Sequence, residues 1–249
     1  MVKDFENKNE WALILGGSSG LGLATAKKLA KHGMNICIVH RNSRSQLEIV
    51  EKHFREIASN PVDFISYNTD AFQSKKRTEL VENLNQELKG GKIKILVHSV
   101  AKGNLKPMVS DSIPILKTDD FQLTIQAMGI SLYDWVKAVF EVKLFSEDAR
   151  VVSFTSEGNR KAWRNYAAVS AAKVTLEAIT RNIALEFACF GIKANCIQAG
   201  VTDTASLRMI PGSDKIIKHS LQRNPLSLIH ISEPTRPLYI SYAVVCLKK

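Results

Sequence analysis

Short apolar runs alternate with amphipathic stretches along most of the chain. The first run, 11–15, is followed by a glycine-rich segment at 16–22, an amphipathic stretch at 23–31 and a second apolar run at 35–39. A continuous apolar run predicts a buried strand, and apolar residues at helical spacing after the glycines predict a helix. The opening segment therefore predicts a β-α-β unit.

The same alternation continues towards the C-terminus. Further strands are predicted at 62–67, 94–97, 149–154 and 191–197, and further helices at 46–58, 78–88, 121–142 and 166–190. Strands that alternate with helices are typical of a parallel sheet covered on both faces. The sequence thus predicts a single Rossmann-type α/β domain, a doubly wound parallel sheet with helices on both faces.

The last segment breaks this alternation. Residues 226–236 read LSLIHISEPTR and residues 240–249 read ISYAVVCLKK, and apart from Val245 both resemble the translation of a sequencing-library adapter. We therefore expect a natural domain over 1–225, with its last strand missing, and a non-native tail over 226–249. The alternative is a genuine hydrophobic C-terminal tail.

Composition fits one globular domain. The chain has 249 residues, of which 45% are hydrophobic and 23% charged. Neither a secretory h-region near the start nor an apolar run long enough to cross a bilayer is present, so we expect no membrane association and a cytoplasmic location. The four cysteines lack metal-ligand spacing and predict reduced thiols and no metal site: Cys37, Cys189, Cys196 and Cys246.

The net charge of +10 is compatible with nucleic acid, a membrane surface or an acidic protein as partner. No basic region is interleaved with aromatic residues, which disfavours nucleic acid. Arg160, Lys161 and Arg164 could meet an acidic carrier protein or a coenzyme A phosphate, and a solvated basic face is the alternative.

The glycine-rich segment GGSSGLG carries the first candidate chemistry. It joins a predicted strand to a predicted helix, where glycines allow backbone N–H groups at the helix N-terminus to approach a pyrophosphate. We therefore predict dinucleotide binding. The residues expected to contact the cofactor here are Gly16, Ser18, Ser19, Gly20, Leu21 and Gly22.

The end of the second predicted strand indicates which dinucleotide binds. An acidic residue there would bind the free ribose 2′-hydroxyl of NAD, but the sequence is HRNSR. Arg41 and Arg44 can instead pair with a 2′-phosphate, so NADPH is favoured over NADH. The alternative is a solvated basic turn.

Tyr166 and Lys173 form the second candidate site. They lie seven residues apart in an alanine-rich stretch, and this spacing predicts that both side chains face the same side of one helix. The lysine could hold a cofactor hydroxyl and favour the phenolate, and the tyrosine could polarise a substrate oxygen. The alternative is two residues on a solvated helix face.

Together these motifs resemble the short-chain dehydrogenase/reductase family. The spacing Gly-x-x-x-Gly-x-Gly and the register of Ser156, seventeen residues before Lys173, are similar to those of the family, although Leu15 replaces its usual threonine. The tyrosine of most members lies four residues before the lysine, where this chain has Val169. Tyr-x6-Lys resembles the enoyl-acyl-carrier-protein reductase branch, and Ser156 resembles a smaller NADPH-dependent subgroup of it.

Two further features agree with this branch. His98-Ser99 stands where most of the family has Asn-Asn, and Met128 stands where carbonyl-reducing members carry a relay asparagine. Moving the tyrosine back by about one turn, some 4.5 Å, suits an oxyanion two carbons away from the hydride acceptor, as in an enoyl thioester. His98 itself is given no catalytic role.

The resemblance also implies further contacts. It places the cofactor against Asp70, Ala71, Ser99, Val100, Ala101, Gly200, Thr202 and Thr204 in addition to Tyr166 and Lys173. For Asp70 an N-cap of the next helix is an alternative role. Segment 105–117 is expected to cover the mouth of the site, and 206–217 to form a lid helix, with a plain surface helix as its alternative.

The expected function is the reduction of the C=C bond of a trans-2-enoyl thioester by NADPH in fatty-acid synthesis. The expected acyl carrier is an acyl carrier protein or coenzyme A, and the expected catalytic residues are Tyr166, Lys173 and Ser156. The alternatives are a carbonyl or alcohol oxidoreductase and a non-catalytic NADP-binding regulator. The resemblance implies a homotetramer or homodimer for the full-length parent.

Overall fold

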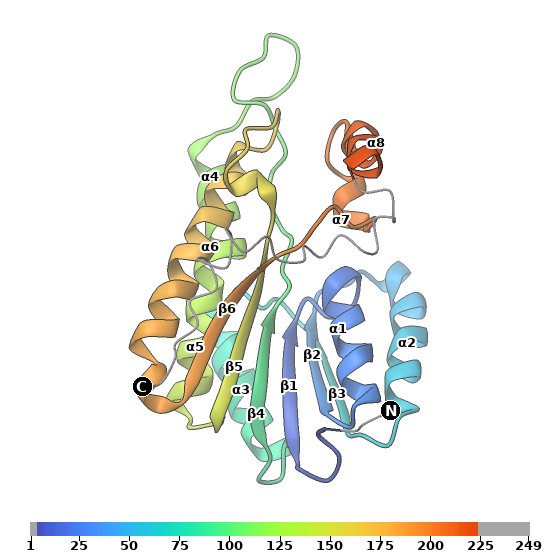
Figure 1. Ribbon diagram of the computed structural model, residues 1–249, viewed down its shortest axis with the longest axis vertical. Coiled ribbons are helices and arrows are strands. Elements are labelled where there is room, and N and C mark those ends of the chain that lie inside the picture. The colour runs from blue at the N-terminus through green and yellow to red at the C-terminus, as the bar shows by residue number, and fades with distance from the viewer. Residues whose placement is uncertain (1–3, 224–249) are drawn as a thin grey trace.

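The computed structural model describes residues 4–223, which form one six-stranded sheet with helices on both faces (Figure 1). The strands are β1 (Glu10–Leu15), β2 (Asn35–His40), β3 (Phe64–Asn68), β4 (Lys92–His98), β5 (Phe145–Thr155) and β6 (Ile192–Gln198). The helices are α1 (Gly20–Lys31), α2 (Arg44–Ala58), α3 (Ser74–Glu87), α4 (Thr118–Ile125), α5 (Ser131–Glu141), α6 (Ala167–Glu186), α7 (Ala205–Arg208) and α8 (Ser213–Arg223). The predicted fold class is confirmed, whereas the predicted boundary at 225 and the tail 226–249 lie outside the described residues.

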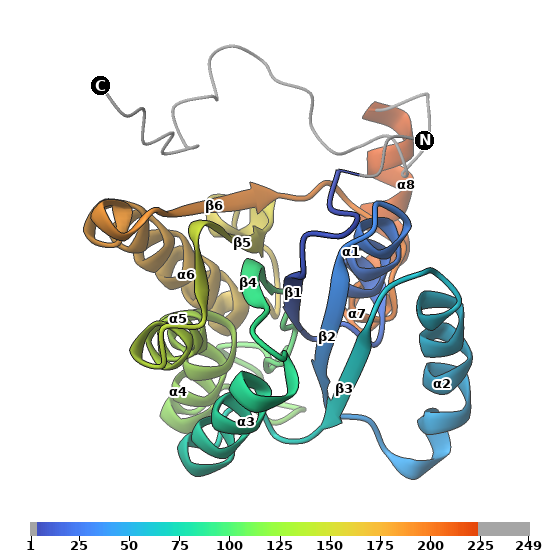
Figure 2. The same cartoon turned by 90° about the horizontal axis from the view of Figure 1, so that it is seen from below.

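The sheet is parallel throughout and has the order β3-β2-β1-β4-β5-β6. From β1 the chain adds β2 and β3 on one side, and it then crosses to the other side of β1 to form β4, β5 and β6. Doubly wound sheets bind ligands at the point between β1 and β4 where the strand order reverses. Helices α1 and α2 cover one face, and α3, α4, α5 and α6 cover the other (Figure 2). No helix in the described part of the chain is long and apolar enough to span a membrane.

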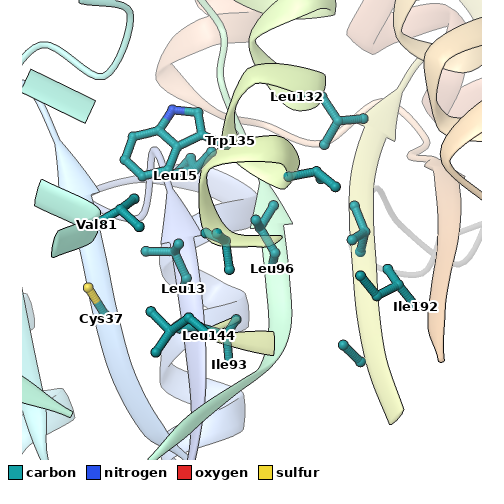
Figure 3. Packing of buried hydrophobic residues seen from close by; sticks show 14 of the residues in the cluster. Leu13, Leu15, Cys37, Val81, Ile93, Leu96, Leu132, Trp135, Leu144 and Ile192 are labelled. Atoms are coloured by element: carbon teal, nitrogen blue, oxygen red, sulfur yellow. The ribbon is translucent and has the colours of Figure 1, made fainter. Parts of the chain in front are cut away.

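Two apolar clusters, one on each face of the sheet, explain why the strand sequences are continuous hydrophobic runs. On one face Leu13, Leu15 and Leu96 pack against Trp135 of α5 and Val81 of α3 (Figure 3). On the other face the remaining strand residues pack against α1 and α2. Each central strand is therefore buried on both sides, as parallel strands usually are.

The prediction of a single helix at 121–142 is wrong in detail. A π-helical segment, Gln126–Ile130, separates α4 from α5. Gly129 in this segment packs closely on α6, since a Cβ there would lie 3.0 Å from Thr175 Cγ2 and 3.2 Å from Ala172 O. The wider turn leaves Ser131 buried, with its Oγ donating to the carbonyl of Ala127 at 2.7 Å.

Two other predicted helices also differ. Tyr166 is the N-cap of α6 rather than a residue of its first turn, since Asn165 before it has a left-handed φ of 63°. The predicted lid helix is two shorter helices, α7 and α8, and Gly212 between them has a φ of 80°. In each case a residue in the left-handed region interrupts a sequence with helical periodicity.

Candidate functional site

A large cavity opens at the carboxyl ends of the strands. It has a volume of about 1210 Å³ and is lined from the ends of β1, β2, β4, β5 and β6, with α7 and α8 at its margin. Ligand sites in proteins occupy roughly 300–1,000 Å³. The cavity therefore has room for a dinucleotide together with a second molecule.

The phosphate end of the cavity is built by close approach of backbone to backbone. Gly16 has a φ of 80°, and a Cβ on it would lie 2.2 Å from the carbonyl oxygen of Ser99, which follows β4. A Cβ on Gly22 would lie 2.5 Å from the carbonyl oxygen of Gly16. Glycine is required at both positions because any side chain would push the loop away from its neighbours.

The N-terminus of α1 faces this end of the cavity. Its N-cap, Ser19, lines the cavity and makes no side-chain capping bond, and the first turn of α1 contains no acidic residue. Uncapped N–H groups and the positive end of a helix dipole fit an anionic pyrophosphate. The residues present thus fit a nicotinamide dinucleotide.

The structure brings most of the predicted cofactor residues to this cavity. Its lining includes Gly16, Ser18, Ser19, Gly20, Leu21, Arg41, Ala71, Ser99, Val100, Ala101, Tyr166, Lys173, Gly200, Thr202 and Thr204. Gly22, Arg44 and Asp70 are outside the lining. Gly22 packs behind the loop, as described above, and Arg44 is the exposed first residue of α2.

Asp70 is engaged by its neighbours. Its Oδ2 accepts a hydrogen bond from Arg41 Nη1 at 2.8 Å, and its Oδ1 accepts one from the backbone N–H of Phe72 at 3.1 Å. The alternative role as an N-cap is wrong, because α3 begins after Gln73. Asp70 instead fixes Arg41, whose side chain is 62% exposed at the cavity margin.

The three predicted catalytic residues meet in the cavity from two elements. Ser156, just after β5, and Tyr166, at the start of α6, have their hydroxyl oxygens 3.3 Å apart. Lys173 lies on the buried face of α6, as Leu176 does. Its Nζ donates a hydrogen bond to the carbonyl oxygen of Phe154 at 2.7 Å. All three line the cavity that contains the glycine loop.

Burial shifts the pKa values of Tyr166 and Lys173. It raises the pKa of Tyr166, against an opposing effect of the hydrogen bond from Ser156. It lowers the pKa of Lys173 from 10.5 to about 8, with Cys196 and Glu177 opposing the shift. These shifts do not favour a tyrosine phenolate in this structure, where burial outweighs the hydrogen bond to Ser156 and Lys173 Nζ donates to the β5 backbone.

Comparison with known proteins identifies the family. A family model described as Enoyl-(Acyl carrier protein) reductase matches residues 16–235. The chain belongs to this family of short-chain dehydrogenases/reductases. It is accordingly an oxidoreductase that binds a nicotinamide cofactor.

Curated relatives of this short-chain dehydrogenase/reductase differ in their reactions. A 7alpha-hydroxysteroid dehydrogenase from Paraclostridium sordellii is 26% identical over 89% of this chain and 80% of its own length. The enoyl-acyl-carrier-protein reductase (NADPH) FabI from Staphylococcus aureus is also 26% identical, over 90% of this chain and 84% of its own length. The chain is thus about equally similar to a hydroxysteroid dehydrogenase and to an enoyl-acyl-carrier-protein reductase.

Solved structures share the fold. A dehydrogenase/reductase from Sinorhizobium meliloti superimposes with a TM-score of 0.73 at 20% identity, covering 86% of this chain and 79% of that one. A short chain dehydrogenase from Burkholderia cenocepacia in complex with NADP has a TM-score of 0.68 at 24% identity, covering 80% and 76%.

Two residues that pack against Tyr166 were not among the predicted site residues. The Trp163 ring packs on the Tyr166 ring with centroids 5.1 Å apart, and a Cβ on Gly158 would lie 2.4 Å from Tyr166 Cε1. Only Gly158 had a sequence signal, as a glycine at the end of the segment 155–158 that follows a predicted strand. Trp163 had none, because its contact depends on the path of an irregular segment.

His98, the last residue of β4, contacts Ser131, the first residue of α5. Its Nε2 lies 2.8 Å from Ser131 Oγ, and burial lowers its pKa to about 3. A neutral, hydrogen-bonded histidine inside the protein is consistent with the prediction that it has no catalytic role. Met128 lies in the π-helical segment and lines the cavity without offering an amide.

Of the two segments expected to cover the cavity, 206–217 does so more fully than 105–117. Ile210, after α7, packs against the cluster that contains Tyr166 and Met128, so the lid segment does face the cavity. In segment 105–117, Leu105 lines the cavity, but Val109 is 83% exposed at a loop that extends away from the body of the molecule (Figure 1). The structure therefore places the cover on the α7 side.

Proposed function

We propose that this protein reduces the C=C bond of a trans-2-enoyl thioester with hydride from NADPH, as a step of fatty-acid synthesis. The observation that carries the proposal is the position of the only tyrosine hydroxyl in the described lining of the cavity. Tyr166 lies at the N-cap of α6, while the position four residues before Lys173 is Val169, a buried apolar residue. The proton donor is thereby displaced along α6 relative to Lys173.

The chain's own residues then perform three tasks. The glycine loop and the N-terminus of α1 hold the pyrophosphate, and Lys173 holds a ribose hydroxyl. When bound, the cofactor supplies the hydride for the β-carbon of the substrate. Burial raises the pKa of Tyr166 above its ordinary value, which keeps its hydroxyl protonated, and its O–H donates to the thioester oxygen and stabilises the enolate.

Ser156 orients the Tyr166 hydroxyl through their mutual hydrogen bond. The α-carbon of the enolate receives its proton from Tyr166 or from solvent. Trp163 packs on the ring of Tyr166, and Ile210 packs against the cluster that contains it, so the Tyr166 side chain is buried. This geometry suits proton donation to an oxygen at a distance from the carbon that accepts hydride.

The proposal is tested by comparing NADPH oxidation with a crotonyl thioester and with an acetoacetyl thioester. We expect the crotonyl thioester to be preferred and Tyr166→Phe to lower kcat by about 100-fold or more, the usual cost of removing an oxyanion donor. Tyr133→Phe, at an exposed tyrosine of α5, is the matched control and should leave kcat unchanged. Near-full turnover by Tyr166→Phe would sink the proposal.

A carbonyl or alcohol oxidoreductase is the second candidate. It is favoured by the equal identity to the 7alpha-hydroxysteroid dehydrogenase. Preference for the acetoacetyl thioester, or for a hydroxysteroid with NADP, would support it. Cofactor binding without turnover of any of these substrates would instead indicate a non-catalytic regulator.

We further propose NADPH as the cofactor. Arg41 is held by Asp70 at the margin of the cavity, and Asn42 and Ser43, which precede α2, line the same margin. A cation beside a helix N-terminus suits a 2′-phosphate. The S. aureus relative is described with NADPH, but another from Enterococcus faecalis is described with NADH.

Arg41→Ala and Arg44→Ala test this cofactor preference. Loss of charge-assisted bonds at Arg41 should weaken NADPH binding by roughly 10- to 100-fold and leave NADH binding unchanged. Arg44→Ala should change neither dissociation constant, because Arg44 is outside the cavity lining. Equal weakening of NADPH and NADH by Arg41→Ala would contradict a contact with the 2′-phosphate.

The remaining proposals concern the oligomeric state, the location in the cell and the contact with the acyl carrier. Members of this family are typically oligomeric, and we propose a homodimer or homotetramer in the cytoplasm. The proposed carrier contact through Arg160, Lys161 and Arg164 is weakened at one position, since Lys161 Nζ already donates to Glu157 Oε2 at 2.7 Å.

A further inference from the structure

Glu177 connects α6 to the end of β5 and to the segment after it, which contains Ser156. It lies one turn after Lys173 on α6, and its Oε1 accepts a hydrogen bond from Thr155 Oγ1 at 2.5 Å. The same oxygen accepts a second hydrogen bond from Asn159 Nδ2. Thr155 and Asn159 flank Ser156, so one carboxylate oxygen fastens both ends of the segment 155–159.

We infer that Glu177 is a positioning residue, which holds segment 155–159 against α6 and thereby sets the distance between the Ser156 and Tyr166 hydroxyls. The two hydroxyls come from different elements, since Ser156 follows β5 and Tyr166 begins α6. Their separation therefore depends on bonds that join these elements. The bond from Lys173 Nζ to Phe154 O and the bond between the Ser153 and Thr180 hydroxyls, 3.1 Å apart, hold β5 before Ser156. The two bonds to Glu177 hold the residues on either side of Ser156.

The bonds within the segment cannot replace this connection. The backbone N–H of Asn159 donates to Ser156 O at 3.2 Å, and that of Arg160 donates to Glu157 O at 3.1 Å. These bonds fix the shape of the turn but not its position relative to α6. Hydrogen bonds to a charged carboxylate are also the stronger kind.

The segment has room to move if the carboxylate is lost. A small cavity of about 40 Å³ lies beside it and is lined by Thr155, Asn159 and Glu177. On the other side Gly158 packs against the Tyr166 ring. A shift of the turn into the small cavity would therefore change the surroundings of Tyr166 as well as those of Ser156.

Glu177→Ala and Glu177→Gln test the inference, which for its kinetic part rests on the proposed function. A misplacement of about 1 Å can cost roughly 100-fold in rate, so we expect Glu177→Ala to lower kcat by about that factor without changing the KM for NADPH. Glu177→Gln should recover most of the rate, because the amide oxygen still accepts both hydrogen bonds. Glu186→Ala, at an exposed glutamate near the end of α6, is the matched control.

Amide hydrogen exchange at 156–160 gives a readout that does not need a substrate. Exchange should become faster in Glu177→Ala and should remain at the wild-type rate in Glu177→Gln and Glu186→Ala. If Glu177→Ala does not fold, Asn159→Ala, which removes one of the two bonds, should show part of both effects.

The two proposals fail in different ways. A wild-type protein that reduces no enoyl thioester overturns the proposed function, and hydrogen exchange still decides the role of Glu177. Wild-type exchange and wild-type kcat in both Glu177→Ala and Asn159→Ala would overturn the positioning role. Equal losses in Glu177→Ala and Glu177→Gln would also overturn it, since the effect would then depend on charge rather than on the two bonds.

Discussion

The two ends of the cavity are held together by different kinds of contact. At the phosphate end, backbone meets backbone, because Gly16 and Gly22 bring β1, β4 and α1 closer than any side chain would allow. At the catalytic end, side chains from α6 reach the end of β5, as Lys173 does to the carbonyl of Phe154. The phosphate end therefore tolerates no added atoms, whereas the catalytic end depends on directed hydrogen bonds.

The two ends also differ in their electrostatics. The phosphate end offers the positive end of a helix dipole and uncapped N–H groups, which need no ionisable side chain. The catalytic end buries a lysine and a tyrosine, and burial opposes the charged form of both. Substitutions at the phosphate end should thus act mainly through packing, and those at the catalytic end through charge and geometry.

The largest expected effect tests the packing at the phosphate end. Gly16→Ala combines a positive φ with a clash against the carbonyl oxygen of Ser99, so it should lower the free energy of unfolding by about 4 kcal/mol. It should also abolish cofactor binding. Urea-induced unfolding and a cofactor fluorescence titration measure the two quantities.

Gly90→Ala is the matched control for this experiment. Gly90 has a φ of 82°, close to that of Gly16, but nothing lies within 4 Å of a Cβ placed on it. It should therefore cost only the backbone strain, about 1 kcal/mol, and leave cofactor binding intact. Equal losses in the two variants would show that close packing does not distinguish the phosphate end.

The difference between the two ends explains what could be predicted from the sequence. The phosphate end is encoded locally, since the glycine spacing between an apolar run and an amphipathic stretch predicts β1, the loop and α1. The parallel sheet followed from the same alternation along the chain. These features depend on residues that are close together in the sequence.

The catalytic end could be predicted only in part. The spacing of Ser156, Tyr166 and Lys173 predicted that they meet, but the bonds of Glu177 to Asn159 and of Arg41 to Asp70 join residues far apart, with no periodic signal. The π-helical segment packs closely on α6 at Gly129, and helical periodicity does not encode this departure from an α-helix. Side-chain contacts between elements require the structure itself.

A smaller effect tests the buried charge at the catalytic end. The folded-state pKa of Lys173, about 8, lies below its ordinary value of 10.5, so between these pH values the unfolded chain binds more protons than the folded one. The free energy of unfolding of the wild type should therefore rise relative to that of Lys173→Met between pH 8 and pH 10.5, by roughly 3 kcal/mol at most.

Lys52→Met provides the comparison for this pH series. Lys52 is exposed on α2, so its replacement should leave the difference from the wild type constant over the same pH range. Urea-induced unfolding of the cofactor-free proteins, measured at several pH values, gives the result. A flat difference for Lys173→Met would mean that burial of Lys173 does not oppose its charge.

The smallest effect concerns the backbone before Tyr166. Asn165 has a φ of 63°, a conformation that asparagine adopts more readily than a β-branched residue does. Asn165→Val should therefore lower the free energy of unfolding by about 1–2 kcal/mol and, by moving Tyr166, lower kcat as well. Asn165→Gly should retain both stability and kcat, because glycine adopts this conformation without strain.

Lys143→Val separates the two consequences of this strain. Lys143 has a φ of 54° and lies just before β5, at the end of the sheet away from the cavity. The Lys143→Val protein should lose about as much free energy of unfolding as Asn165→Val, measured by urea-induced unfolding, and should keep the wild-type kcat. If Asn165→Val also kept its kcat while losing stability, the left-handed residue would serve the fold alone, and the position of Tyr166 would depend on Trp163, Gly158 and Ser156.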